Sequence, residues 1–111
     1  MIYTSYFAQT DKIKHPVSIA RKSPKGFRGE QYRDLAPPWK IIMASKRGLI
    51  TPEQYTVEYK KIISSLDVHT VARDLDGKTL LCWEKPGVFC HRHLVAAWLR
   101  DFGYQAEEVC F

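Results

Sequence analysis

Hydrophobic and polar residues follow two spacings along this chain, and together they predict strands alternating with helices. Runs of β-branched and aromatic residues, typical of short strands, occur at residues 1–7, 16–20, 79–84 and 105–111. Apolar residues three and four positions apart indicate helices at residues 39–47, 52–66, 68–75 and 91–102. Glycine and proline stand between several of these segments, where turns are expected.

The order of the predicted elements favours an α/β domain. Because helices connect most of the strands, the economical arrangement is a small three-layer domain with a short, mostly parallel sheet and helices on both faces. A length of 111 residues suits one domain, residues 1–111. The link of about eight residues between the first two strands is too short for a standard parallel crossover, so this pairing is the least constrained part of the prediction.

The segment 78–103 carries the sharpest chemical pattern. Cys82 and Glu84 lie two apart on the predicted strand and therefore share a face. The following helix places His91 in its first turn on the inward side, with Arg92 beside it. No Ser, Thr, Asp or Asn precedes His91 at the capping positions, so the helix is predicted to begin uncapped and to attract anions. Ligands of open α/β sheets bind just past the carboxyl ends of strands, which is where this segment lies.

Composition and charge narrow the class of protein and of partner. A hydrophobic content of 45% and a charged content of 26% are ordinary for a soluble domain, and neither a signal peptide nor a membrane-spanning stretch is predicted. Three scattered cysteines argue against a disulfide framework and favour a reduced, cytoplasmic setting. Residues 11–33 hold seven Lys and Arg against two acidic residues, which accounts for the whole net charge of +5. Such a segment suits a phosphorylated small molecule or nucleic acid as partner, and it equally suits a solvated basic loop.

The run LLCWEKPGVFCHRHLVAAWL, residues 80–99, resembles the pattern of the domain-of-unknown-function 488 family, in which a Leu-Cys-x-Glu strand precedes Cys-His-Arg on a helix. MIYTSYFA and SIARKSPKGFRGEQYRDLAP resemble the family's opening strand and its Ser-Pro loop, and ITPEQYTVEYKKI resembles its Thr-x-x-x-Tyr helix. The likeness covers nearly the whole length and implies a compact α/β protein whose activity the family's name leaves open. Ser18 departs from the pattern, because many members carry Asp there. The resemblance marks six site residues: Arg21, Cys82, Glu84, Cys90, His91 and Arg92.

The chemistry of these residues favours a thiol site. Cys90, at the start of a helix and beside a histidine and an arginine, is expected to ionise readily. Cys82 would be an alternative nucleophile or a resolving partner, and Glu84 would act as general acid or base. Arg21 and Arg92 are predicted to bind an anionic group of the substrate.

Two alternatives remain open. Zinc could be bound by a set of five side chains: Cys82, Glu84, Cys90, His91 and His93. The irregular spacing of the cysteines and the different helix faces of the two histidines argue against a metal, and no cofactor is predicted. Aromatic residues interleaved with the basic segment are also typical of a non-catalytic nucleic-acid or protein-binding module. Because Glu84 beside an anion site suits proton transfer, the favoured prediction is an enzyme that performs hydrolysis or group transfer on a phosphorylated or nucleotide-like anion.

Overall fold

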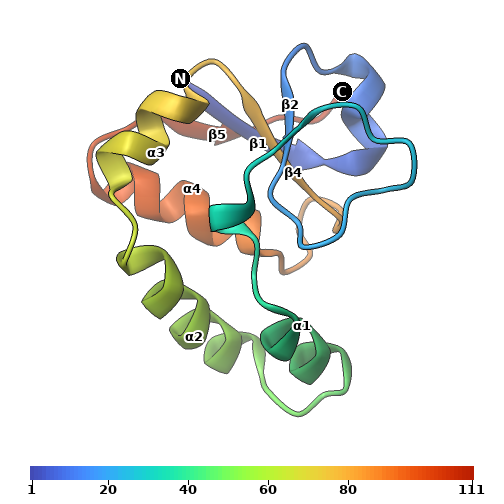
Figure 1. The fold of residues 1–111 in the computed structure, drawn as a ribbon, viewed down its shortest axis with the longest axis vertical. Coiled ribbons are helices and arrows are strands. Elements are labelled where there is room, and N and C mark those ends of the chain that lie inside the picture. Colours follow the sequence, from blue (N-terminus) through green and yellow to red (C-terminus); the bar gives the residue numbers. More distant parts are fainter.

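The computed structural model describes all 111 residues and contains one five-stranded sheet in which every pairing is parallel (Figure 1). The strands stand in the order β3-β2-β4-β1-β5. They comprise β1 (Ile2–Tyr6), β2 (Pro16–Ser18), β3 (Glu30–Gln31), β4 (Thr79–Cys82) and β5 (Ala106–Glu108). The four predicted strands are therefore present at shorter lengths, and β3 is an additional edge strand.

Four α-helices and two 3₁₀-helices connect the strands. They are η1 (Phe7–Lys12), η2 (Arg33–Leu35), α1 (Trp39–Lys46), α2 (Pro52–Ser64), α3 (Val68–Leu75) and α4 (His91–Asp101). Helix α2 begins with a reciprocal capping box, in which the Thr51 hydroxyl accepts from Gln54 N at 3.1 Å and the Gln54 side chain accepts from Thr51 N at 2.7 Å. Helix α4 ends before Gly103, whose φ of +89° is the left-handed conformation that favours glycine there. The predicted helices are thus confirmed, with ends that differ by at most two residues.

The two faces of the sheet are covered by different kinds of helix. A cluster of 17 buried residues packs α2, α3 and α4 against one face. A smaller cluster of Phe7, Ala20 and Leu81, with Phe27 against it, covers the other face through η1 and the segment after β2. Leu80 and Leu81 are successive residues of β4 and contribute to opposite clusters, as strand geometry requires. Helices therefore lie on both faces, with a 3₁₀-helix forming the thinner layer.

The strand connections create a crevice at the end of β4. The segments that follow β1 and β2 pass over the face of the smaller cluster, whereas the segment after β4 leads over the α-helical face to β5. Since β4 lies between β1 and β2, its outgoing chain diverges from those of both neighbours. In open α/β sheets this divergence is the topological switch point at which ligands bind.

The short link between β1 and β2 does form a parallel crossover, so the expected difficulty does not arise. Its 3₁₀-helix η1 has six residues and spans about 12 Å, because a 3₁₀-helix rises about 2.0 Å per residue rather than 1.5 Å. No helix has an apolar stretch long enough to cross a bilayer.

Candidate functional site

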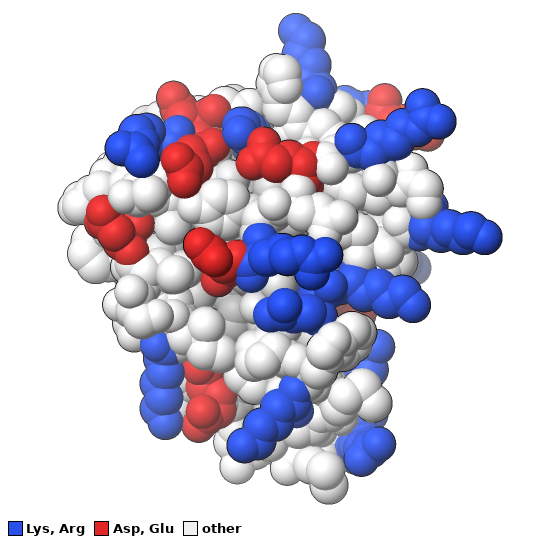
Figure 2. Space-filling model, viewed as in Figure 1, with Lys and Arg blue, Asp and Glu red and all other residues white.

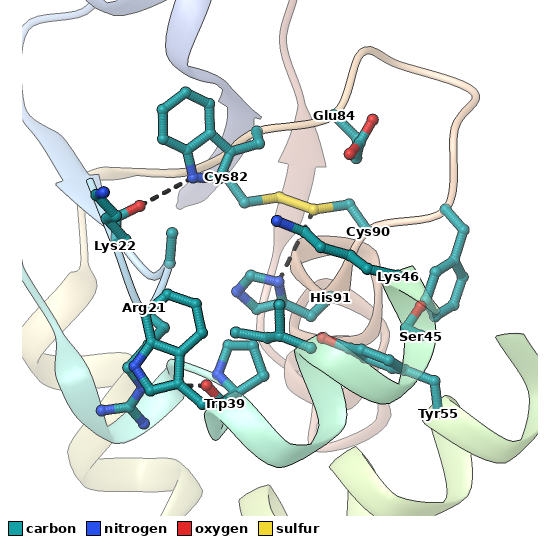
Figure 3. Close-up of a pocket in the computed structure, with 15 residues that line it drawn as sticks. Arg21, Lys22, Trp39, Ser45, Lys46, Tyr55, Cys82, Glu84, Cys90 and His91 are labelled. Atoms are coloured by element: carbon teal, nitrogen blue, oxygen red, sulfur yellow. Dashed lines mark hydrogen bonds between the residues drawn. A yellow bond between two sulfur atoms is a disulfide. The ribbon is translucent and has the colours of Figure 1, made fainter. Parts of the chain in front are cut away.

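A pocket of about 440 Å³ opens at this switch point, past the carboxyl ends of β2 and β4 (Figure 3). Its wall is formed by the segment after β2, one side of α1, a tyrosine of α2, and the loop that joins β4 to α4. Five of the six predicted site residues line it, namely Arg21, Cys82, Glu84, Cys90 and His91. The volume is within the range of small-molecule sites.

Cys82 and Cys90 are joined by a disulfide bond on the pocket wall. Cys82 closes β4 and Cys90 is the N-cap residue of α4, so the loop between them returns the chain to the same edge of the sheet. The scattered cysteines argued against a disulfide framework, so this bond was not predicted, although Cys82 was considered as a resolving partner. In this state neither cysteine is a free nucleophile. Cys110 is the free cysteine and is exposed.

His91 is buried with a single defined tautomer. Its Nε2 lies 2.7 Å from the carbonyl oxygen of Ile19, and because a carbonyl only accepts, Nε2 carries the proton. Nδ1 of the neutral ring is then an acceptor, and it lies 3.8 Å from Cys90 Sγ. Burial lowers the pKa of His91 to about 4, because the effect of burial is larger than the opposite effect of the Ile19 hydrogen bond. The ring is therefore neutral at pH 7 and presents a lone pair to the sulfur atoms.

Arg92 is a wholly buried interior residue and does not line the pocket. Its Nη2 and Nε donate to the Glu108 carboxylate of β5 at 2.8 and 3.1 Å. Its Nη1 donates to the carbonyl oxygen of Glu84 at 2.6 Å and to Cys82 Sγ at 3.1 Å. The predicted contact between Arg92 and a substrate anion is therefore not supported, because protein acceptors already engage the guanidinium. Arg92 positions the end of β4 instead.

Glu108 is a structural partner that the sequence did not single out. Burial alone would raise the pKa of Glu108, but hydrogen bonds from Arg92 and Thr4 outweigh burial and lower that pKa below its usual value. The carboxylate is therefore ionised at neutral pH and balances the buried guanidinium. The sequence shows a charged residue in the final strand, but no local pattern indicates that its side chain turns toward the interior.

Arg21 and Glu84 occupy opposite ends of the pocket (Figure 3). The guanidinium of Arg21 donates to the carbonyl oxygens of Pro37 and Ala36, each at 3.1 Å, and so fixes the start of α1. The side chain of Glu84 is exposed on the loop after β4, and its carboxylate makes no hydrogen bond or ion pair within the protein. Of the two side chains, that of Glu84 is the one available to a ligand.

Aromatic and cationic side chains complete the wall, and sequence analysis did not assign them to the site. Trp39 and Trp83 are about half exposed, at 50% and 53%, and the Trp83 indole is held by a hydrogen bond to the carbonyl of Lys22 at 2.9 Å. Figure 3 shows the side chain of Lys46 reaching across the pocket toward the sulfur pair. Helix α1, which carries Trp39 and Lys46, could be predicted, but the residues that its outer face meets could not.

Two further features give the surroundings of the pocket a positive electrostatic character. As predicted, no side chain caps α4, and no acidic residue lies in its first turn to offset the uncapped backbone N–H groups. Figure 2 shows Lys and Arg side chains dominating the side of the molecule that carries η1, the segment after β2 and α1. Acidic side chains in this view lie mainly over the side that carries α3.

The chain matches no family model, no curated protein and no solved structure. The resemblance to the domain-of-unknown-function 488 family therefore stays a prediction.

Proposed function

We propose that this chain is an enzyme that binds a phosphorylated or nucleotide-like anion in the pocket and hydrolyses it or transfers a group from it. One observation carries the proposal: cationic, aromatic and proton-transferring side chains line the same pocket as a pair of cysteines. Such convergence of polar groups at a strand-end crevice is typical of active sites.

The ligand would be recognised in two ways, by charged groups that contact its phosphate and by aromatic rings that stack on its planar part. The ammonium groups of Lys22 and Lys46 supply point charges for a phosphate. The exposed indoles of Trp39 and Trp83 supply flat apolar surfaces on which a base or another planar group stacks. The two requirements together favour a nucleotide-like anion over an inorganic one.

The reaction begins with the reduced pair of cysteines. A cellular dithiol supplies two electrons and two protons, which convert the disulfide to two thiols and leave the dithiol oxidised. Arg92 Nη1, 3.1 Å from Cys82 Sγ, favours the thiolate of Cys82 because a hydrogen bond from a cation stabilises the charged form.

The Cys82 thiolate then attacks the phosphorus or carbon at the reacting centre, so that a bond to sulfur forms and the bond to the leaving oxygen breaks. Glu84 gives a proton to the leaving oxygen and afterwards takes one from water. The water oxygen attacks the same centre, the bond to sulfur breaks, and the thiolate is regenerated. Another acceptor in place of water gives group transfer.

Binding can be tested by calorimetry with AMP, adenosine and inorganic pyrophosphate. We expect AMP to bind most tightly, because it alone combines a planar base with a phosphate. Lys46→Gln should weaken AMP binding by about tenfold, or about 1.4 kcal/mol, while Lys60→Gln on the exposed side of α2 should not. Equal, unsaturable binding of all three compounds would reject the proposed ligand class.

Turnover can be tested on the reduced chain by measuring release of phosphate from a nucleotide panel. Glu84→Gln should lower the rate by about 10²–10⁴-fold with affinity changed less than twofold. Cys82→Ser should abolish turnover, whereas Cys110→Ser, which removes the exposed free cysteine, should leave the rate unchanged. Undiminished turnover in Cys82→Ser would refute the proposed nucleophile.

A non-catalytic nucleic-acid-binding module is a second candidate, favoured by the gathering of basic side chains described above. Binding to single-stranded DNA or RNA would then decline steeply with salt, because phosphate contacts release counterions. Glu84→Gln would leave this binding intact. Salt-dependent binding together with no turnover would select the module over the enzyme.

A further inference from the structure

Three potential metal-ligating atoms converge where β4 meets α4. The Sγ atoms of Cys82 and Cys90 and a ring nitrogen of His91 all lie within 4.8 Å of one another. With Zn–S bonds of about 2.3 Å and Zn–N bonds of about 2.0–2.1 Å, neighbouring ligand atoms of a tetrahedral zinc site lie about 3.5–3.8 Å apart. Cys90 Sγ and His91 Nδ1, at 3.8 Å, already have this spacing.

The orientation of His91 supports the same interpretation independently of the cysteines. Histidines that bind metals almost always donate their other ring N–H to a carboxylate, a backbone carbonyl or water. His91 Nε2 donates to the carbonyl of Ile19 at 2.7 Å, so the ring is fixed with Nδ1 toward the sulfur atoms. The carbonyl belongs to the segment after β2, which lies 72 residues earlier in the chain.

The charges around the site also suit a divalent cation. Two thiolates would balance the charge of the ion, and the guanidinium of Arg92 would donate to Cys82 Sγ as an outer partner. The positive charge of Arg92 is already paired with Glu108 at 2.8 Å, so it does not stand unopposed beside the ion.

We propose that, once the disulfide is reduced, Cys82, Cys90 and His91 bind a divalent metal ion of the zinc class. A dithiol supplies two electrons and two protons to the disulfide, and binding of the ion then releases the two thiol protons to water. Oxidation of the cysteines removes two of the three ligands and releases the ion. The site does not rest on the proposed enzymatic function, and a metal-bound Cys82 would not be the free nucleophile described above.

Three protein ligands leave the fourth position of a tetrahedral ion open. All three residues line the pocket, so the open position faces the space in which a ligand would bind. Closed structural zinc sites have four protein ligands, whereas sites with three keep a place for water or substrate. The irregular spacing of the cysteines, which argued against a metal, reflects ligands drawn from a strand end and a helix start.

Cobalt substitution tests the site directly. The chain is reduced with a phosphine, freed of metal, and titrated with Co²⁺ while its absorption is recorded. We expect one equivalent to give the visible bands of tetrahedral Co²⁺ with a thiolate-to-cobalt band, and Zn²⁺ to displace it. The oxidised chain should give no such spectrum. An octahedral spectrum, or an identical spectrum in the oxidised chain, would overturn the proposal.

Variants assign the ligands. Cys82→Ser, Cys90→Ser and His91→Gln should each weaken Co²⁺ binding by more than about 100-fold, since even loss of an outer-shell partner weakens it about 10–100-fold. Cys110→Ser and His93→Gln are matched controls and should bind as the parent chain does. Retention of the tetrahedral spectrum in His91→Gln would contradict the assignment.

A measurement on the unaltered chain avoids variants that fail to fold. Zn²⁺ should protect Cys82 and Cys90, but not Cys110, from alkylation of the reduced protein, as mapped by mass spectrometry. Equal labelling of all three cysteines with and without Zn²⁺ would overturn the proposal. Nucleotide binding measured on the oxidised, metal-free chain tests the pocket separately, so either idea can fail alone.

Discussion

Replacing Arg92 by methionine tests the most heavily bonded side chain of the interior. The guanidinium is fully buried and donates to Glu108 of β5, to the carbonyl of Glu84 and to Cys82 Sγ at the end of β4. Methionine retains an apolar side chain that fills part of the space, so the change removes mainly hydrogen bonds and charge. The variant therefore measures what holds β4, α4 and β5 together.

The expected loss follows from the burial of the two partners. Removing one partner of a buried ion pair costs about 3–5 kcal/mol, because the other charge is left uncompensated. The Glu108 side chain is 27% exposed, so water recovers part of its solvation and the lower end applies, about 3 kcal/mol. For a domain of this size, roughly 4 °C of melting temperature accompanies each kcal/mol, which gives a decrease of about 12 °C.

Urea denaturation of the oxidised chain measures this loss. Glu108→Gln keeps the shape but replaces charged hydrogen bonds with neutral ones and should cost about 2 kcal/mol. The double variant should lose about 1–2 kcal/mol less than the sum of the single changes, since the two side chains interact directly. Arg73→Met is the control, because Arg73 is exposed and its ion pair with Asp74 is 3.8 Å long. Additive losses, or an Arg92→Met variant within 1 kcal/mol of the parent, would refute the reasoning.

Other predictions concern the disulfide, a helix cap and a tyrosine. Reduction of the Cys82–Cys90 disulfide in the presence of a chelator should lower the free energy of unfolding by about 2.5 kcal/mol, as expected for a sequence separation of 8. Equal urea midpoints before and after reduction would argue against the bond. Thr51→Ala should cost about 1 kcal/mol of that free energy by removing the capping box, whereas Ser64→Ala at the other end of α2 should cost less than half as much. Burial and the hydrogen bond to Asp74 raise the pKa of Tyr32 to about 12, above the ordinary value of about 10. The contribution of un-ionised Tyr32 to the free energy of unfolding is therefore fully present below pH 10 and is lost as the pH rises through 12. The difference between the ultraviolet titrations of the parent and of Tyr32→Phe should show one tyrosine that ionises late, near pH 12. If the tyrosine absent from the variant instead ionises near pH 10, this burial is contradicted.

The predictions that succeeded depend on short-range patterns. Apolar spacing, the Thr51 capping box and Gly103 mark the helices because their physical causes act within a few residues. The same locality placed Cys82 and His91 at one end of the sheet, since a strand end and the next helix start must meet there.

The predictions that failed depend on residues far apart in the chain. The expectation that Arg92 faces an anion failed because its actual partner, Glu108, lies 16 residues later in the chain. Glu108 is on a strand whose inward-facing side chains no local pattern reveals. Strand β3 was missed because its residues, Glu30 and Gln31, are exposed and polar and pair with β2 only through the backbone. The pairing of the cysteines depends on the path of the loop between them, which spacing does not determine.

The ion pair between α4 and β5 also bears on how the domain opens. Strand β5 lies at the edge of the sheet and has three residues, a length at which fraying would ordinarily be frequent. Its departure would leave Arg92 charged and unmatched inside the protein, so β5 and the first turn of α4 should exchange their amide hydrogens as one cooperative unit. The protection of this edge strand is then set by an interior cation rather than by its own hydrogen bonds.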